Sequence, residues 1–162
     1  MKAIQKITPC LWFDSAAEEA ARFYVSVFKN ARIGRISHYG VEGFKIHGRP
    51  EGSVMTVEFE IAGRAFTALN GGPHFKFNEA ISFQIPCETQ KEIDHYWERL
   101  SADGEIQQCG WLKDRLGVSW QIFPAALPEM LRDPDKAARA MRAMLGMKKL
   151  DIAELRAAYE GK

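Results

Sequence analysis

Tryptophan rings and side-chain amides recur in segments that are predicted to be strands. Trp12, Trp111 and Trp120 are the tryptophans of this set. The polar side chains that accompany them are Asn70, Gln84, Cys109 and Gln121. Indole rings stack on flat molecules, and carboxamides both donate and accept hydrogen bonds. The set predicts a pocket for a flat or aromatic small molecule, although any one strand tryptophan is also typical of a hydrophobic core.

Trp12 is the tryptophan for which the pattern favours pocket lining. Leu11 and Phe13 stand on either side of it and are expected to face a helix. Because successive side chains of a strand point to opposite faces, Trp12 is then directed away from the helix.

Two side chains are candidates for a direct chemical role. His74 follows Gly72-Pro73, where it can serve as a general base or a hydrogen-bond donor; the alternative is a turn residue. Cys109 would need a basic neighbour or a helix N-terminus to become a nucleophile. Its predicted place on a strand beside glutamines favours an inert, buried thiol. We therefore assign no catalytic residue.

Composition limits the class of protein. The chain has 162 residues, of which 46% are hydrophobic and 27% charged, so we expect one compact domain or two small modules that share a core. Lysine and arginine number 22 against 21 acidic residues, so the net charge of +1 gives no electrostatic field that would attract nucleic acid. No apolar run reaches the roughly 20 residues of a membrane span. We expect a cytoplasmic protein with reduced cysteines and no membrane partner.

The first half predicts the order βαβββ. A strand over residues 7–13 leads to a Ser15-x-x-Glu18 capping box and a helix that ends near Lys29. Further strands are predicted at residues 33–39, 54–62 and 64–70, and a glycine-rich, mobile loop at residues 40–53.

The same order recurs about 73 residues later. A strand over residues 81–85 precedes a Thr89-x-x-Glu92 capping box and a helix that ends at Asp103-Gly104; strands at 105–111 and 118–123 follow. The fold class is therefore α+β, with modules at residues 4–72 and 78–124 in one domain, 1–124. Residues 125–162 form a helical extension, where Met141, Met144 and Met147 indicate a packing stripe or a methionine-rich ligand surface.

Paired βαβββ modules resemble the vicinal-oxygen-chelate superfamily, which includes glyoxalase I, bleomycin-resistance proteins and extradiol dioxygenases. Within it, several motifs look like the PhnB-like branch, often labelled 3-demethylubiquinone-9 3-methyltransferase. These motifs are ITPCLWFD (7–14), EAARFY (19–24), LNGGP (69–73), CGWLKD (109–114), GVSWQI (117–122) and AMLGMKK (143–149). The resemblance implies a curled mixed sheet around a central cavity, and a homodimer.

The resemblance also implies four positions for ligands of a divalent metal ion. They fall on Thr8 or Ile7, on Ala80, on Asn70 or Ala68, and on Gln121. None is histidine, aspartate, glutamate or cysteine, the side chains that hold catalytic metals. We therefore predict a degenerate metal site and no cofactor, with weak metal binding as the alternative.

Three functions remain open, and whether the protein is an enzyme is not decided. We favour a small-molecule binding protein, as the bleomycin-resistance relatives imply. The first alternative is a metal-dependent lyase, isomerase or dioxygenase. The second is the labelled methyltransferase, which is disfavoured because Gly71-Gly72 leads into Pro73 and a strand, not into a Rossmann helix.

Overall fold

The structure, a computed structural model, describes residues 5–162. The chain divides into two compact units between Lys76 and Phe77. Each unit contains one four-stranded mixed sheet. The second unit also includes every helix after residue 124, so the helical extension is integrated with the second module.

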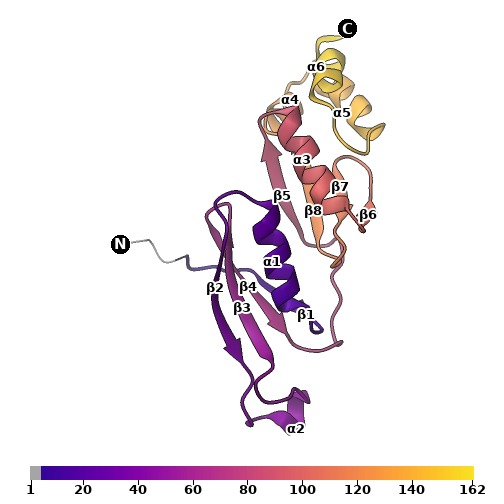
Figure 1. Ribbon diagram of the computed structural model, residues 1–162. Coiled ribbons are helices and arrows are strands. Elements are labelled where there is room, and N and C mark those ends of the chain that lie inside the picture. Colours follow the sequence, from indigo (N-terminus) through magenta and orange to yellow (C-terminus); the bar gives the residue numbers. More distant parts are fainter. Residues whose placement is uncertain (1–4) are drawn as a thin grey trace. The chain divides into compact units, whose positions relative to one another are not determined.

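The first unit has the predicted βαβββ order, with a short helix in the connection between its second and third strands (Figure 1). Its strands lie in the order β1-β4-β3-β2; β1 is parallel to β4 and the other pairs are antiparallel. Its elements are β1 (Cys10–Phe13), α1 (Ala17–Val27), β2 (Arg32–His38), α2 (Phe44–His47), β3 (Val54–Ile61) and β4 (Arg64–Asn70). Helix α2 lies within the predicted loop at residues 40–53.

Alternation along the strands places apolar side chains under α1. Leu11 and Phe13 of β1 are buried, whereas Trp12 between them is half-buried. Phe59 of β3 stacks on Tyr24 of α1 with ring centroids 5.9 Å apart. One face of the sheet therefore packs against α1, and Trp12 lies on the other face, as predicted.

The N-terminus of α1 is capped by a residue far away in the sequence. The predicted Ser15-x-x-Glu18 capping box does not form: the N-cap is Ala16, and it makes no side-chain capping bond. Instead the backbone N–H of Ala17 donates to Oδ1 of Asn70, at 2.8 Å. The other end of the same amide, Nδ2 of Asn70, donates to the backbone oxygen of Val54 at 3.0 Å.

We expect Asn70→Ala to destabilise the first unit by about 2 kcal/mol, because it removes a helix cap and leaves two backbone groups without this partner. Urea unfolding followed by circular dichroism measures the loss. Asn78→Ala is the control, since Asn78 is exposed and its Oδ1 accepts from the backbone N–H of Ala80, two residues away. Equal stability losses in the two variants would contradict the structural role of Asn70.

The second unit repeats the topology of the first. Its strand order is β5-β8-β7-β6, with β5 parallel to β8 and the remaining pairs antiparallel. The elements of this module are β5 (Ser82–Cys87), α3 (Gln90–Ser101), β6 (Glu105–Ile106), β7 (Trp111–Lys113) and β8 (Ser119–Pro124). The α+β class and the paired βαβββ modules are thus confirmed.

The N-cap predicted for α3 forms, with the first of the two bonds of a capping box. Oγ1 of Thr89 accepts from the backbone N–H of Glu92 at 3.2 Å. The carboxylate of Glu92 accepts from the backbone N–H of Glu88, the residue before the N-cap, at 2.8 Å. The helix therefore starts where the sequence pattern placed it.

The strand predicted at residues 105–111 is wrong in its second half. Strand β6 ends at Ile106, and a turn occupies the residues before β7. Cys109 and Gly110 both have left-handed backbone, with φ of 59° and 82°. Cys109 therefore lies in a turn and is half-buried, rather than on a strand.

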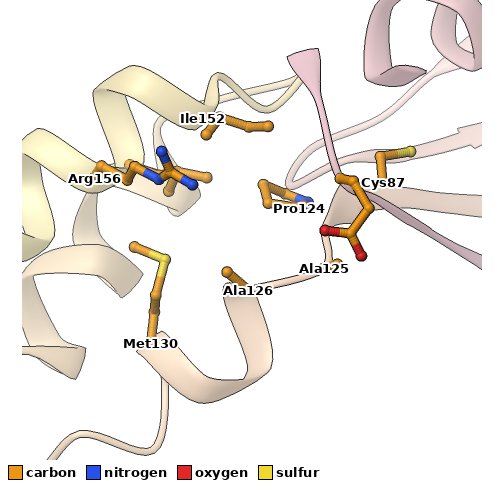
Figure 2. Close-up of a pocket in the computed structure, with 9 residues that line it drawn as sticks. Cys87, Pro124, Ala125, Ala126, Met130, Ile152 and Arg156 are labelled. Atoms are coloured by element: carbon orange, nitrogen blue, oxygen red, sulfur yellow. The ribbon is translucent and has the colours of Figure 1, made fainter. Parts of the chain in front are cut away.

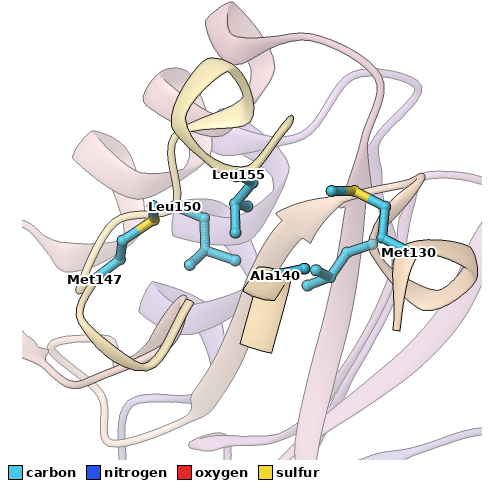
Figure 3. Close-up of a cluster of buried hydrophobic side chains, with 6 residues drawn as sticks. Met130, Ala140, Met147, Leu150 and Leu155 are labelled. Atoms are coloured by element: carbon cyan, nitrogen blue, oxygen red, sulfur yellow. The ribbon is translucent and has the colours of Figure 1, made fainter. Parts of the chain in front are cut away.

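The extension forms α4 (Leu127–Met130), α5 (Ala137–Leu145) and α6 (Ile152–Glu160). Figure 3 shows the cluster of buried side chains that these helices share with the segment between α5 and α6. Its members are Leu127, Met130, Ala140, Met147, Leu150 and Leu155. Of the methionine stripe, Met147 is buried, Met144 is half-buried and Met141 is 39% exposed. Among the described residues, no helix is long and apolar enough to cross a membrane.

Candidate functional site

Three strands of the second sheet place a row of side chains on the face opposite α3. Gln84 of β5 is paired with Gln121 of β8, and Gln121 is paired with Trp111 of β7. Nε2 of Gln121 donates to Oγ of Ser82 at 2.8 Å, and Nε2 of Gln84 lies 3.4 Å from Oε1 of Gln121. These bonds fix the orientation of the Gln121 amide beside the Trp111 ring.

A cavity of about 320 Å³ lies over this row. Four of the residues predicted to line a pocket meet there: Gln84, Cys109, Trp111 and Gln121. The remaining lining residues are Phe123, Leu127, Pro128, Leu131 and Met144. The volume is within the range of small-molecule sites, and a mostly apolar wall with a few placed amides is their usual composition.

Sequence reasoning missed the residues of this cavity that follow Gln121. Phe123 was within reach of the pattern, because it alternates with Ile122 and so shares the face of Gln121. Met144 belonged to the methionine stripe, for which a ligand surface was one interpretation. Leu127, Pro128 and Leu131 carried no signal, because their contact with the sheet depends on how the extension folds back.

Trp120, also predicted to line the pocket, lies on the helix-covered face instead. Its side chain is 2% exposed, and Nε1 donates to Oδ2 of Asp114 at 2.8 Å. Asp114 is 3% exposed, and its Oδ1 accepts from the backbone N–H groups of Leu116 and Val118. Asp114 thus holds the β7–β8 hairpin, and Trp120 belongs to the core.

Trp12, Asn70 and His74 belong to the first unit. Nε1 of Trp12 donates to the backbone oxygen of Gly72 at 2.9 Å, and its ring meets Phe75 edge-on at 4.9 Å. A Cβ atom at Gly71 would lie 2.2 Å from the Trp12 ring, so only glycine fits there. His74 is exposed in the turn that follows.

The first sheet also has a hollow, of about 470 Å³, which is lined by residues of β2, β3 and β4. Thr8 lies at this hollow together with Arg32, Glu58 and Glu60. The charges are paired within the sheet: Arg32 with Glu60 at 2.9 Å and Arg35 with Glu58 at 2.7 Å. Aromatic and amide groups gather in the cavity of the second unit, which is why we take that cavity as the candidate site.

Asn70, one of the positions mapped to a metal ligand, does not face the open side of its sheet. It is 7% exposed and pairs with the buried Phe13 at the end of β1. Oδ1 of Asn70 accepts from Ala17 at the start of α1, and Nδ2 donates to Val54. Both ends of this amide are therefore engaged within the protein.

The residues at the mapped positions do not fit a divalent transition metal. Thr8 and Ala80 are exposed, Ala80 has no side-chain donor, and Asn70 is committed to backbone groups. Gln121 alone offers an oxygen on the open face of its sheet, and a neutral amide is a weak ligand. Within residues 5–162, no three His, Cys, Asp or Glu side chains are grouped to hold a metal ion.

A second, much smaller cavity of about 40 Å³ lies between β5, β8 and the extension (Figure 2). Cys87 and Pro124 line one side of it, and Met130, Ile152 and Arg156 lie opposite. Burial raises the pKa of the Cys87 thiol from 9.0 to about 12, with a smaller contribution from the charge of Glu92. This cavity is water-sized and its thiol is protonated at neutral pH.

We expect Cys87 to react with iodoacetamide at least about 100-fold more slowly than the exposed Cys10, because only the thiolate reacts. Peptide mass spectrometry after alkylation near pH 8 measures both rates. Since the folded-state pKa is raised, Cys87 favours the folded state below about pH 9 and loses this effect as the pH rises toward 12. Equal alkylation rates in the native protein would contradict the burial of Cys87.

A family model described as 3-demethylubiquinone-9 3-methyltransferase matches residues 5–123. The chain belongs to this family. It is the PhnB-like branch of the vicinal-oxygen-chelate superfamily, in agreement with the repeated βαβββ topology. The match ends at β8, so the extension that completes the cavity lies outside the matched residues.

Solved structures agree with this assignment. A PhnB protein from Bacillus cereus that carries the same methyltransferase name is 37% identical, with a TM-score of 0.64 over 73% of this chain and 98% of that one. Protein PA1353 from Pseudomonas aeruginosa (18% identity, TM-score 0.58, 75% and 98% covered) shares the fold. So does the fosfomycin resistance protein FosX from Listeria monocytogenes (21%, 0.50, 82% and 99%). No curated protein matches the chain significantly.

Proposed function

We propose that the protein binds an uncharged, flat or aromatic small molecule in the cavity of its second unit, without a cofactor. The observation that carries the proposal is the convergence of Gln84, Gln121 and Trp111 in one row on the floor of that cavity. The Trp111 ring offers a stacking surface, and the two amides offer directed hydrogen bonds.

The bonding within the row defines what a ligand would meet. Nε2 of Gln121 is engaged with Ser82, and Oε1 of Gln121 faces Nε2 of Gln84. The carbonyl oxygen of Gln84 has no partner among the described residues, so it is the acceptor offered to a ligand hydroxyl or N–H. Among the residues that the structure describes, no Asp, Glu, Lys, Arg or His lines the cavity, and a charged ligand would be desolvated without a partner.

The direct test uses N-phenyl-1-naphthylamine, a neutral aromatic amine whose fluorescence increases in an apolar site. We expect the full chain to bind it saturably with one site per chain, and native mass spectrometry to show the same stoichiometry. A signal that rises linearly without saturation, together with no bound mass, would contradict the proposal.

The family description favours methyl transfer as a second candidate function. The sheets of both units are mixed, with one parallel pair each, whereas S-adenosylmethionine sites of the Rossmann type use a parallel sheet and a glycine-rich turn. We expect no heat on titrating S-adenosylmethionine at millimolar concentration by calorimetry. Saturable heat would establish the methyltransferase as the better assignment.

The proposal includes a homodimer in the cytoplasm, as the family resemblance implies. Size-exclusion chromatography with light scattering measures the state directly: a dimer has twice the chain mass of 18.3 kDa. A mass of one chain across the micromolar range would remove the dimer from the proposal and leave the binding site as it stands.

A further inference from the structure

The cavity of the second unit has two chemically different walls. The sheet side supplies the amides of Gln84 and Gln121 and the ring of Trp111. The extension supplies aliphatic and thioether side chains only: Leu127, Pro128, Leu131 and Met144. A molecule that fills the cavity therefore meets hydrogen-bonding groups on one side and only apolar groups on the other.

The apolar wall is fixed to the sheet by backbone hydrogen bonds. The N–H groups of Cys109 and Gly110 donate to the carbonyl oxygens of Met147 and Lys148, both at 2.8 Å. A Cβ atom at Gly110 would lie 2.4 Å from the backbone oxygen of Ile122, so this close approach requires glycine. The turn that contains Cys109, a residue that lines the cavity, is therefore bonded to Met147 and Lys148, which follow the helix that carries Met144.

Further contacts hold the extension against α3. The side chain of Gln90 bonds the extension twice: Nε2 donates to the backbone oxygen of Leu150 at 3.1 Å, and Oε1 accepts from the N–H of Ile152 at 2.9 Å. Lys149 pairs with Asp94 at 2.6 Å. Together with the buried cluster of Figure 3, these bonds preorganise the wall before a ligand binds.

The wall also lies beyond the residues that the family model matches. The family match ends at residue 123, and the Bacillus cereus protein is covered over 98% of its length by 73% of this chain. The amide row and Trp111 therefore lie within the matched residues, whereas the apolar wall is supplied by residues beyond the match.

We propose that the extension is the specificity-determining wall of the site, and that the ligand is a neutral amphiphile. Its polar aromatic end lies on Gln84, Gln121 and Trp111, and its alkyl or alicyclic end lies against Met144 and Leu131. This inference rests on the proposed function, because it assigns the two ends of a ligand within that same cavity.

A homologous series of 4-alkylphenols, from ethyl to hexyl, tests the assignment by displacement of N-phenyl-1-naphthylamine from the full chain. Each methylene that leaves water for the apolar wall should tighten binding by up to about fourfold. In Met144→Ala the gain in affinity should fall below about twofold per methylene, since the alkyl chain of the ligand loses its contact surface on the protein. Leu131→Ala provides a second variant with the same expected decrease, and thermal melts confirm that each variant is folded.

Met141→Ala is the matched control. It removes the same side chain from the same helix at a position that is 39% exposed and does not line the cavity, so the wild-type gain per methylene should remain. Gln84→Ala should weaken every phenol by a similar factor and leave the gain unchanged, because it acts on the polar end.

The outcomes separate this inference from the proposed function. An unchanged gain per methylene in both Met144→Ala and Leu131→Ala overturns the specificity role of the extension while the binding site stands. Phenols that fail to displace a bound probe overturn the amphiphilic ligand. Failure of the probe itself to bind overturns the proposed function, and the inference with it.

Discussion

Asp114→Ala should lower the free energy of unfolding by about 3–5 kcal/mol, the largest single-residue effect on stability that we expect. Asp114 is 3% exposed, and its carboxylate accepts from the N–H of Leu116 at 2.8 Å, the N–H of Val118 at 3.1 Å and Nε1 of Trp120 at 2.8 Å. Removing the carboxylate leaves these donors unsatisfied in a low-dielectric interior, and each costs about 1–3 kcal/mol.

Chemical denaturation followed by tryptophan fluorescence measures this effect. Asp135→Ala is the control, because Asp135 is an exposed aspartate of the same unit, and the change should stay within about 0.5 kcal/mol. The loss of stability in Asp114→Asn should be intermediate, since the amide keeps one acceptor oxygen but presents its NH₂ group to one of the donors. A loss below about 1 kcal/mol for Asp114→Ala would show that the hairpin does not depend on the carboxylate.

Trp111→Ala should weaken binding of N-phenyl-1-naphthylamine by about 30-fold or more, the largest effect on binding that we expect. A buried aromatic anchor is typically worth about 2 kcal/mol or more when truncated. Trp111 adjoins Gln121 in the strand register and lines the cavity, so its ring is the stacking surface that a flat ligand meets.

Trp111→Phe should recover most of the affinity, because a smaller aromatic face remains. Ile106→Ala on the neighbouring strand β6 is the control; its side chain is 46% exposed and does not line the cavity. Equal affinities for wild type and a folded Trp111→Ala variant would contradict the role of Trp111.

Topology was the most predictable part of the molecule. Two strand-cap-helix patterns in one chain predicted paired modules, and the strand orders β1-β4-β3-β2 and β5-β8-β7-β6 agree. The predicted cap at Thr89 formed, whereas the one at Ser15 did not. The difference is tertiary: Oδ1 of Asn70 supplies the acceptor for α1, a contact across 53 residues that no local pattern contains.

The candidate site was predictable where strand alternation decided it. Gln84 and Gln121 share one face of the second sheet. Trp120 is next to Gln121 in β8, so the same alternation places it on the opposite face, although it was predicted to line the pocket. Asn70 was assigned to the pocket because its amide accompanies the strand tryptophans, whereas in the structure that amide is bonded to Ala17 and Val54. The apolar wall was beyond the pattern, because Met144 reaches the sheet only through the fold of the whole extension.

The indole N–H signals in a ¹H–¹⁵N spectrum test the central claim most directly, because the chain has four tryptophans in distinct environments. On titration with N-phenyl-1-naphthylamine, the Trp111 signal should shift the most and saturate together with the side-chain NH₂ signals of Gln84 and Gln121. The signals of Trp12, Trp97 and Trp120 should move little. A dominant shift at Trp12 with Trp111 unmoved would contradict a ligand site on the second sheet.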